Sequence, residues 1–154
     1  MKLAYFTLAL LFILGSYTQL AAQHDHKTEL GMSNAPVFFL KESGLAYGLH
    51  FHLIRSINSS RFGVGLGYER IFDAHEHHTV GFVGSYFCTE RLRLNLAPGV
   101  TFEGGWDSEK FLSVHLEAEY GWEVGEFHIG PAAEIAYDPE DIHLSLGLHV
   151  GFGF

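Results

Sequence analysis

An unbroken alternation of large apolar residues with small or polar ones runs through the last thirteen residues, 142–154. The apolar members are Ile142, Leu144, Leu146, Leu148, Val150, Phe152 and Phe154, and the others are His143, Ser145, Gly147, His149, Gly151 and Gly153. Successive side chains of a β-strand point to opposite faces, so this pattern predicts a strand with one wholly apolar face. Strands of soluble proteins have about 5 or 6 residues, whereas a membrane-spanning strand needs about 9 to 11. The length and the apolar face therefore indicate a strand that contacts lipid.

Seven turn-like stretches divide the rest of the chain into segments that show the same alternation. They lie at residues 41–44, 58–60, 73–76, 89–91, 104–107, 124–126 and 138–141. Seven turns separate eight strands, and an apolar spacing of two excludes amphipathic helices. The alternation is weaker in the first and fourth strands, where Val37 and Val83 fall among the polar positions. Pro36, Pro98 and Pro131 fall inside strands, and their missing N–H groups predict a β-bulge at each.

The N-terminal residues have the pattern of a secretory signal peptide. Lys2 precedes a short apolar run at 8–14, and small residues follow at Ala21 and Ala22. We expect residues 1–22 to be removed, which leaves one domain, residues 23–154. No later segment reaches about 18 consecutive apolar residues, so a domain that enters a membrane must do so as a closed barrel. Cys88 is the single cysteine, and an intramolecular disulfide is therefore excluded.

Alternation alone does not decide which face of a barrel points inward. In a soluble lipocalin-like barrel the apolar face lines the interior, whereas in a transmembrane barrel it faces lipid. Here aromatic residues crowd the apolar faces and glycines crowd the opposite ones, and glycine fits a narrow interior better than an exposed surface. Aromatic residues suited to interfacial girdles lie toward strand ends, at Tyr47, Tyr68, Tyr86, Tyr120, Trp122 and Tyr137. We therefore predict an all-β, eight-stranded antiparallel up-and-down transmembrane β-barrel, with the soluble barrel as the alternative.

The signal peptide, the eight alternating strands and the terminal series Leu148, Val150, Phe152 and Phe154 resemble the small outer-membrane β-barrels of Gram-negative bacteria, the OmpA- and OmpX-type group. The resemblance covers the whole mature chain. It implies a monomer in the cell outer membrane, surrounded by lipid, with both ends of the chain on the periplasmic side. It also implies that the outer-membrane assembly machinery recognises the C-terminal strand. The resemblance is one of architecture and identifies no functional subfamily, and the short loops argue against adhesion.

The net charge of −9 at pH 7 argues against nucleic acid as a partner and favours cations. In a transmembrane barrel the polar faces would gather many titratable groups in the lumen, with Arg93 almost the only cation among them. The predicted lumenal groups are His50, His52, Glu69, Glu103, His115, Glu117, Glu119, Glu123, His128, Glu134, His143 and His149. One interpretation is a polar network that only fills the interior and stabilises it. The other is a metal or proton site in the outer half, where Glu103, His115, Glu134 and His143 come from four consecutive strands.

Three further histidine groups are candidate metal ligands, although no cofactor is required by the sequence. His50 and His52 share one strand face about 7 Å apart, which suits two ligands of one Zn²⁺ ion. His75, His77 and His78 are expected in the second external loop, and His24 and His26 in an N-terminal tail. Neutral imidazoles beside carboxylates suit Zn²⁺, Cu²⁺ or Ni²⁺.

The predicted role is accessory rather than catalytic: a structural membrane protein, a narrow conduit, or a binder of metal cations. An alternative is a lipid-modifying outer-membrane hydrolase, because His143 and Ser145 share a face and Glu134 lies on the neighbouring strand. The His-x-Ser pair resembles that of the lipid A deacylases, which are also eight-stranded barrels. Leu146 follows Ser145, however, and the longer motif of those enzymes is not reproduced. The soluble lipocalin-like periplasmic barrel is the remaining alternative.

Overall fold

The computed structural model describes residues 27–41, 43–58, 60–104 and 109–154. The predicted signal peptide, residues 1–22, and the histidines His24 and His26 lie outside the described residues. The strands are β1 (Thr28–Phe39), β2 (Leu45–Ser56), β3 (Phe62–Phe72), β4 (His77–Phe87), β5 (Leu92–Glu103), β6 (Glu109–Tyr120), β7 (Trp122–Val124), β8 (Phe127–Tyr137) and β9 (Ile142–Gly153). Within the described part of the chain, no helix has the length and apolar character needed to cross a membrane.

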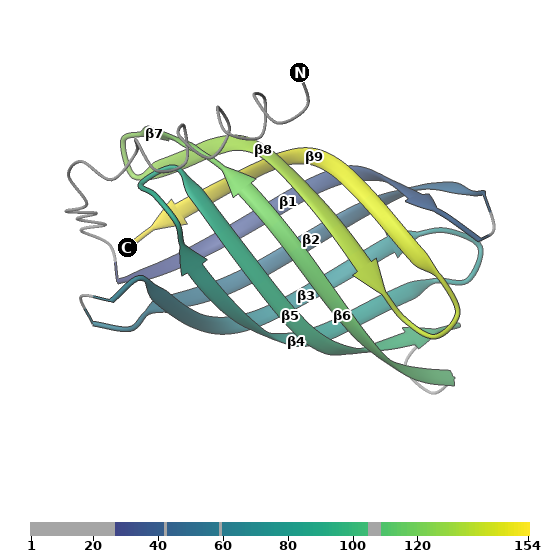
Figure 1. Cartoon of the computed structure of the whole chain (residues 1–154). Helices are drawn as coiled ribbons and strands as arrows, with labels where there is room; N and C mark the ends of the chain where they lie inside the picture. The colour runs from purple at the N-terminus through teal and green to yellow at the C-terminus, as the bar shows by residue number, and fades with distance from the viewer. Residues whose placement is uncertain (1–26, 42, 59, 105–108) are drawn as a thin grey trace, which may run out of the picture.

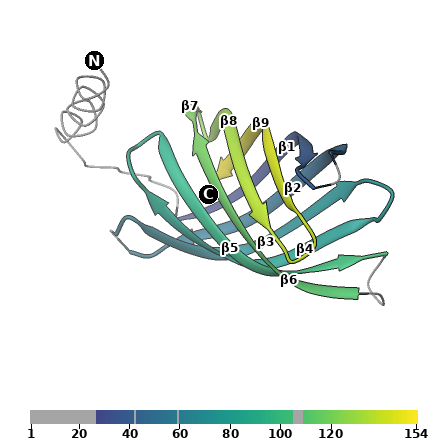
Figure 2. The ribbon, with the colours of Figure 1, turned by 45° about the vertical axis from the view of Figure 1, so that its right-hand side comes forward.

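The strands form one closed antiparallel barrel (Figures 1 and 2). Strands that follow one another in sequence pair with each other, and β1 pairs with β9 to close the ring. The short β7 is a continuation of β6, because both strands pair with β8 in one register. Glu119 of β6 pairs with Ala132, and Trp122 of β7 pairs with Ile129. Together β6 and β7 act as one strand, so the barrel has the eight strands that the alternation predicts.

Both ends of the barrel domain meet at one rim, the inner rim. The backbone N–H of Thr28 donates to the carbonyl of Phe154 at 3.1 Å, and the N–H of Phe154 donates to the carbonyl of Thr28 at 2.9 Å. The β2–β3, β4–β5 and β7–β8 turns lie at this rim. The β1–β2, β3–β4 and β8–β9 turns lie at the opposite, outer rim, where β5 also ends and β6 begins (Figure 1). The predicted turns fall between the observed strands, and β4 begins at His77, directly after the third turn. Residues 105–107 of the fifth predicted turn lie outside the described residues.

Side chains are distributed inside out relative to a soluble protein. Leu146 is 66% exposed and Phe82 72% exposed on the outer surface, whereas His149 is 1% exposed inside. The same alternation dominates the long strands, with apolar residues mostly outward and mostly polar residues or glycines inward. The soluble lipocalin-like alternative is therefore wrong, because it requires the opposite orientation of the two faces.

Aromatic residues mark both rims on the outer surface. Tyr47 and Tyr137 are exposed toward the outer rim, and Tyr86, Tyr120 and Trp122 toward the inner rim. Tyr120 and Trp122 pack edge to face, with ring centroids 5.3 Å apart. Tyrosine and tryptophan combine an apolar ring with a polar group and so suit the boundary between lipid and water. This arrangement agrees with the predicted girdles.

The two valines that interrupt the alternation in β1 and β4 point into the lumen. Val37 packs with Phe39 and Ile71, and Val83 packs in a second cluster. That second cluster comprises Ile54, Val83 and Ala97. The lumen is thus a packed interior of polar groups and two small apolar clusters, as expected for a barrel just wide enough for side chains to fill.

The prolines do not form the predicted bulges. Next to Pro36, Asn34 pairs with Leu148 and Val37 pairs with Ser145, so equal numbers of residues face each other across β1 and β9. The same uninterrupted register runs past Pro98 and Pro131. Each proline keeps its pairing with one neighbouring strand and loses ladder contacts only with the other, which explains why no register shift is needed.

Where this pairing is lost, glycines allow the backbones of the two strands to lie close together. Directly before Pro131, a Cβ added at Gly130 would lie 1.8 Å from the carbonyl oxygen of Tyr120 on the neighbouring strand. Beside Pro36, a Cβ at Gly147 would lie 1.9 Å from the carbonyl oxygen of Asn34. Any other residue at these glycines would push the strands apart, so the prolines are accommodated by close strand contacts rather than by extra residues.

Candidate functional site

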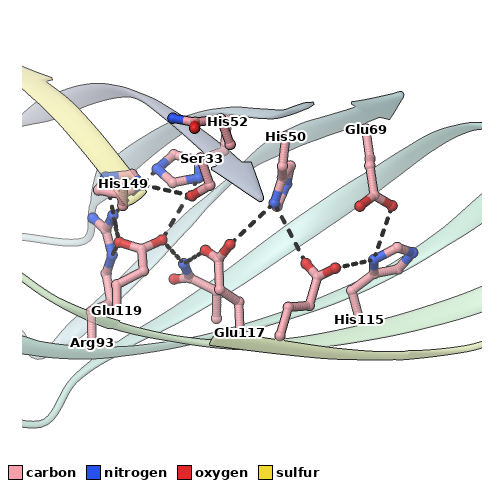
Figure 3. A network of polar contacts seen from close by, with 12 residues as sticks. Ser33, His50, His52, Glu69, Arg93, His115, Glu117, Glu119 and His149 are labelled. Carbon is pink, nitrogen blue, oxygen red and sulfur yellow. Dashed lines mark hydrogen bonds and ion pairs between the residues drawn. The ribbon is translucent and has the colours of Figure 1, made fainter. Parts of the chain in front are cut away.

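Polar side chains fill the lumen in a row that passes from the inner half to the outer half of the barrel (Figure 3). Arg93, Glu119 and His149 stand at one end of the row, and His115 and Glu69 stand at the other (Figure 3). Of the predicted metal ligands, the structure buries the following in this row: His50, His52, His115, Glu134 and His143. Three groups of side chains can be separated along it by their contacts.

The inner lumen group consists of Glu29, His52, Arg93, Glu119 and His149. Arg93 Nη2 donates to Glu29 Oε1 at 2.7 Å, and Arg93 Nε donates to Glu119 Oε2 at 3.0 Å. A further donation from Nη2 to the same Glu119 oxygen makes the second pair two-pronged. His52 Nε2 lies 3.2 Å from Glu29 Oε1. The guanidinium therefore pairs with both carboxylates through direct hydrogen bonds, as a buried charge requires.

Glu29 is the member of this group that the sequence reasoning missed. It shares the inward face of β1 with Ser33 and Val37, a face that was hard to assign because a valine interrupts it. The alternation of strand faces could have identified it, because Glu29, Gly31 and Ser33 are two residues apart and share one face. Among the predicted lumenal groups, His128 belongs beside this cluster, with its Nδ1 3.3 Å from Glu29 Oε2, whereas Glu123 is exposed.

The outer lumen group consists of Glu69, His115, Glu134 and His143, all of which are buried. Each offers a nitrogen or oxygen atom, and these four atoms lie within 4.8 Å of one another. His115 Nδ1 is 3.4 Å from Glu134 Oε1 and 3.5 Å from Glu69 Oε2. His143 Nε2 is 3.9 Å from the same Glu69 oxygen. This arrangement gathers two imidazoles and two carboxylates around one point.

The central lumen group consists of His50, Glu117 and Glu134, so that Glu134 belongs to two groups. His50 Nδ1 lies 3.3 Å from Glu117 Oε2 and 3.6 Å from Glu134 Oε2. Asn95 Nδ2 donates to Glu117 Oε1 at 3.1 Å and to Glu119 Oε1 at 2.6 Å, which links this group to the inner one.

The structure brings together three of the four residues of the predicted four-strand cluster, with a different fourth member. His115, Glu134 and His143 come together, but the fourth member is Glu69 of β3 instead of Glu103 of β5. Glu69 reaches the group from across the lumen, because β3 lies opposite β8 in the ring. Glu103, at the outer end of β5, instead contacts His77.

The pair His50 and His52 does not converge on one point. Their ring centroids are 5.8 Å apart, yet His50 faces Glu117 and Glu134 while His52 faces Glu29. The shared strand face was predicted, but each ring turns toward a different carboxylate on other strands. The pair therefore belongs to two groups in the lumen.

The three histidines expected in the second external loop are in three different settings. His75 lies in the turn, while His77 and His78 are the first residues of β4 and are buried. His77 points inward, with Nδ1 2.6 Å from Asp73 Oδ2 and Nε2 2.5 Å from Glu103 Oε1. His78 lies on the outer surface, where its Nδ1 is 2.8 Å from the Tyr68 hydroxyl. The placement of His77 and His78 in a loop is therefore wrong.

Negative charge collects at the outer rim. The carboxylate of Glu103 raises the pKa of Glu140, an exposed residue of the β8–β9 turn, and Glu109 and Asp138 add to the effect. Like charges so close make the protonated form easier to reach. The rim therefore presents an electrostatic environment that attracts cations.

The residues of the hydrolase alternative all face the lumen. Ser145 lines a small cavity together with Glu134, and His143 is buried in the outer lumen group. The ion-pair partners of Glu134 are His50 and His115. Ser145 thus lies on the opposite side of the barrel wall from the surface that meets acyl chains.

Comparisons with solved structures find the same fold at low sequence identity. Neisserial surface protein A is similar with a TM-score of 0.66 and 12% identity, over 83% of this chain and 97% of that protein. A de novo designed transmembrane β-barrel gives 0.58 and 11%, over 82% and 96%. The N-terminal barrel domain of Pseudomonas aeruginosa OprF gives 0.52 and 16%, over 84% and 98%. The sequence matches no protein-family model and no curated protein.

These likenesses establish the fold, and the chain's own surface establishes its surroundings. An apolar exterior with aromatic rims is what a barrel presents to a bilayer. The predicted architecture is confirmed: the chain is a small, closed, eight-stranded antiparallel barrel of the outer-membrane type.

Proposed function

We propose that this protein is a monomeric structural barrel of the outer membrane that holds divalent transition-metal cations in its lumen. Its inner rim would face the periplasm, and β9 would serve the assembly machinery as its recognition strand. The observation that carries the metal proposal is the outer lumen group, Glu69, His115, Glu134 and His143.

Unmet hydrogen bonding distinguishes the outer lumen group from an ordinary polar network. Glu69 Oε2, both carboxylate oxygens of Glu134, Nε2 of His115 and both ring nitrogens of His143 are buried without a hydrogen-bond partner. A buried polar atom without a partner costs about 1–3 kcal/mol, and more when it is charged. A cation at the centre of the group would satisfy the atoms that face it.

The donor set fits a borderline transition metal. Two imidazoles and two carboxylates suit Zn²⁺ and its neighbours, whereas Mg²⁺ and Ca²⁺ prefer oxygen ligands alone. In the described part of the chain, neither lysine nor arginine forms an ion pair with Glu69 or Glu134. The inner lumen group contains two histidines and two glutamates as well, but there Arg93 is ion-paired with both carboxylates and offsets part of their charge.

A holding role is favoured over conduction. The apolar cluster of Val37, Phe39 and Ile71 lies toward the outer rim, and Phe39 packs against His77 and His143 with ring centroids 5.6 and 5.5 Å apart. Phe39 therefore stands between the outer lumen group and the outer rim. Because apolar side chains interrupt the polar row, a cation in the lumen would bind there rather than pass through.

Zn²⁺ binding to refolded protein in detergent micelles tests the proposal. Zn²⁺ at a hundred times its dissociation constant should stabilise the folded barrel by about 2.7 kcal/mol, and EDTA should reverse the effect. The stabilisation should be larger at pH 7.5 than at pH 5, because protons compete with the metal for imidazole nitrogens. Glu69→Gln should weaken it, and His75→Ala, which changes an exposed turn residue, should not. Equal stability with Zn²⁺ and with EDTA at pH 7.5 would contradict the proposal.

A further inference from the structure

We infer that the lumen binds a pair of divalent cations bridged by the carboxylate of Glu134. This inference rests on the proposed metal binding and specifies its stoichiometry and geometry. The two oxygens of Glu134 face different groups: Oε1 is 3.4 Å from His115 Nδ1, and Oε2 is 3.6 Å from His50 Nδ1. A carboxylate with one oxygen toward each of two ligand clusters has the arrangement of a bridging ligand.

The shortest donor separations in both groups match those around a metal ion. Four ligands about 2.0–2.2 Å from a tetrahedral ion are about 3.3–3.6 Å from one another. His50 Nδ1 and Glu117 Oε2 are 3.3 Å apart, and the closest contacts of His115 are 3.4 and 3.5 Å. Direct charge-assisted hydrogen bonds are shorter, about 2.7–2.9 Å, as between Arg93 and Glu29 at 2.7 Å. The carboxylates of the inner lumen group already have such direct partners in Arg93, although the histidine–carboxylate spacing there is similar, with 3.2 Å between His52 Nε2 and Glu29 Oε1. In the other two groups no direct arginine pair competes, and the spacing leaves room for an ion.

The ligand number is adequate for two ions. The outer lumen group supplies four protein ligands, which completes a tetrahedral site. The central lumen group supplies three, and a cavity of about 10 Å³ adjoins it, lined by His50, Glu117, Glu134 and Ser145 among others. A space of this size admits about one water molecule, which can serve as the fourth ligand.

Charge also favours a pair over a single ion. The two groups together contain the carboxylates of Glu69, Glu117 and Glu134 with three imidazoles, and within the described residues no arginine or lysine is ion-paired with them. One divalent cation would leave this buried set with net negative charge. Two would offset all three carboxylates, and ionisation of a metal-bound water would balance the remaining charge.

The pair would connect opposite walls of the barrel. His50 and Glu69 project from β2 and β3, whereas His115 and Glu117 project from β6, Glu134 from β8 and His143 from β9. In the ring of strands, β2 lies across from β6 and β3 across from β8. Each ion would therefore be held from both sides of the lumen.

Copper binding measures both stoichiometry and proximity. Untagged, refolded protein is titrated with Cu²⁺ in a background with His24→Ala, His26→Ala and His75→Ala, so that these other candidate ligands do not contribute. We expect two equivalents bound per chain and a half-field EPR signal, which arises only when two Cu²⁺ ions lie close enough to couple. Heat-modifiable electrophoretic migration verifies that each variant is folded.

Three variants test the assignment of ligands. Glu117→Gln should leave one equivalent without the half-field signal, because only the central site is impaired. Glu134→Gln should abolish the half-field signal and at least one equivalent, because a neutral amide cannot bridge two cations. Glu90→Gln, at an exposed position in the β4–β5 turn, should retain two equivalents and the signal.

The possible failures are distinguishable. One equivalent in the parent protein would overturn the paired site while leaving metal binding intact, and no binding would overturn both proposals. Two equivalents without the half-field signal would place the ions at separate sites and overturn the bridge. A coupled pair that persists in Glu134→Gln would remove Glu134 from its role.

Discussion

Arginine at Leu66 should destabilise the barrel far more than arginine at Leu45, although both leucines are exposed on the same outer surface. Leu66 is 56% exposed near the middle of β3, and Leu45 is 75% exposed at the outer end of β2. In water, arginine at either exposed position would be nearly neutral. In a bilayer the cost depends on depth, because hydrocarbon does not solvate a guanidinium group.

The depth of Leu66 follows from strand geometry. β3 has 11 residues, which at about 3.4 Å per residue span about 37 Å. With a tilt of about 40°, the strand rises about 28 Å, close to the apolar band of about 25 Å in membrane barrels. Leu66, the fifth residue of β3, then lies about 3 Å from the midplane. Arginine near the midplane costs about 2–4 kcal/mol, against about 0–1 at the interface. A difference of about 3 kcal/mol corresponds to more than a hundredfold in the unfolding equilibrium.

Equilibrium unfolding by guanidinium chloride in phospholipid vesicles measures this difference. Leu66→Arg, Leu45→Arg and the parent protein are compared under conditions where folding is reversible. Equal free energies of unfolding for the two variants would show that the apolar exterior is not in contact with hydrocarbon. That result would refute the assignment of inside and outside on which the lumenal site depends.

Two further predictions concern the inner half of the barrel. Arg93→Met should cost about 3–5 kcal/mol of unfolding free energy, because the buried Glu119 and the partly buried Glu29 lose their counter-ion. Adding Glu119→Gln should recover part of this loss, and a loss below about 1 kcal/mol in Arg93→Met would contradict the prediction. Cys88 lies in the β4–β5 turn, and burial raises the pKa of its thiol, so labelling is best done near pH 8.5. A membrane-impermeant maleimide should not label Cys88 in intact cells but should label it after permeabilisation. Ala74→Cys in a Cys88→Ser background should instead react in intact cells. The reverse pattern would mean that the inner rim faces the cell exterior.

The architecture followed from the sequence because strand alternation is a local property. Residues two positions apart in β9 share a face, so the sequence alone assigns each residue to the apolar or the polar face. The apolar exterior could therefore be predicted without knowing which strands pair. The prolines were misjudged because the prediction considered only the lost N–H of the proline itself. Gly130, next to Pro131 on β8, and Gly147, on the strand that faces Pro36, allow close approach without an added residue, and that depends on a register that the sequence does not reveal.

The candidate site was predicted only in part because its contacts cross the lumen. His115, Glu134 and His143 lie on sequential neighbours, so their proximity could be expected from the order of the strands. Glu69 joins them from the opposite wall, and which residue meets which across a barrel depends on strand tilt and stagger. Glu103 was chosen in its place because β5 neighbours β6, whereas its side chain contacts His77 at the outer rim.

The pairing of β1 with β9 is the one strand pairing that joins segments far apart in the described sequence. All other strand pairings join segments connected by short turns, so they can form early and locally. Bringing Thr28 to Phe154 closes a loop of about 125 residues, at an entropic cost of about 4 kcal/mol. The barrel would therefore close last, in a single cooperative step, and the alternating residues of β9 determine whether that step succeeds. Truncation of this strand should consequently slow folding more than an equally long truncation at any turn.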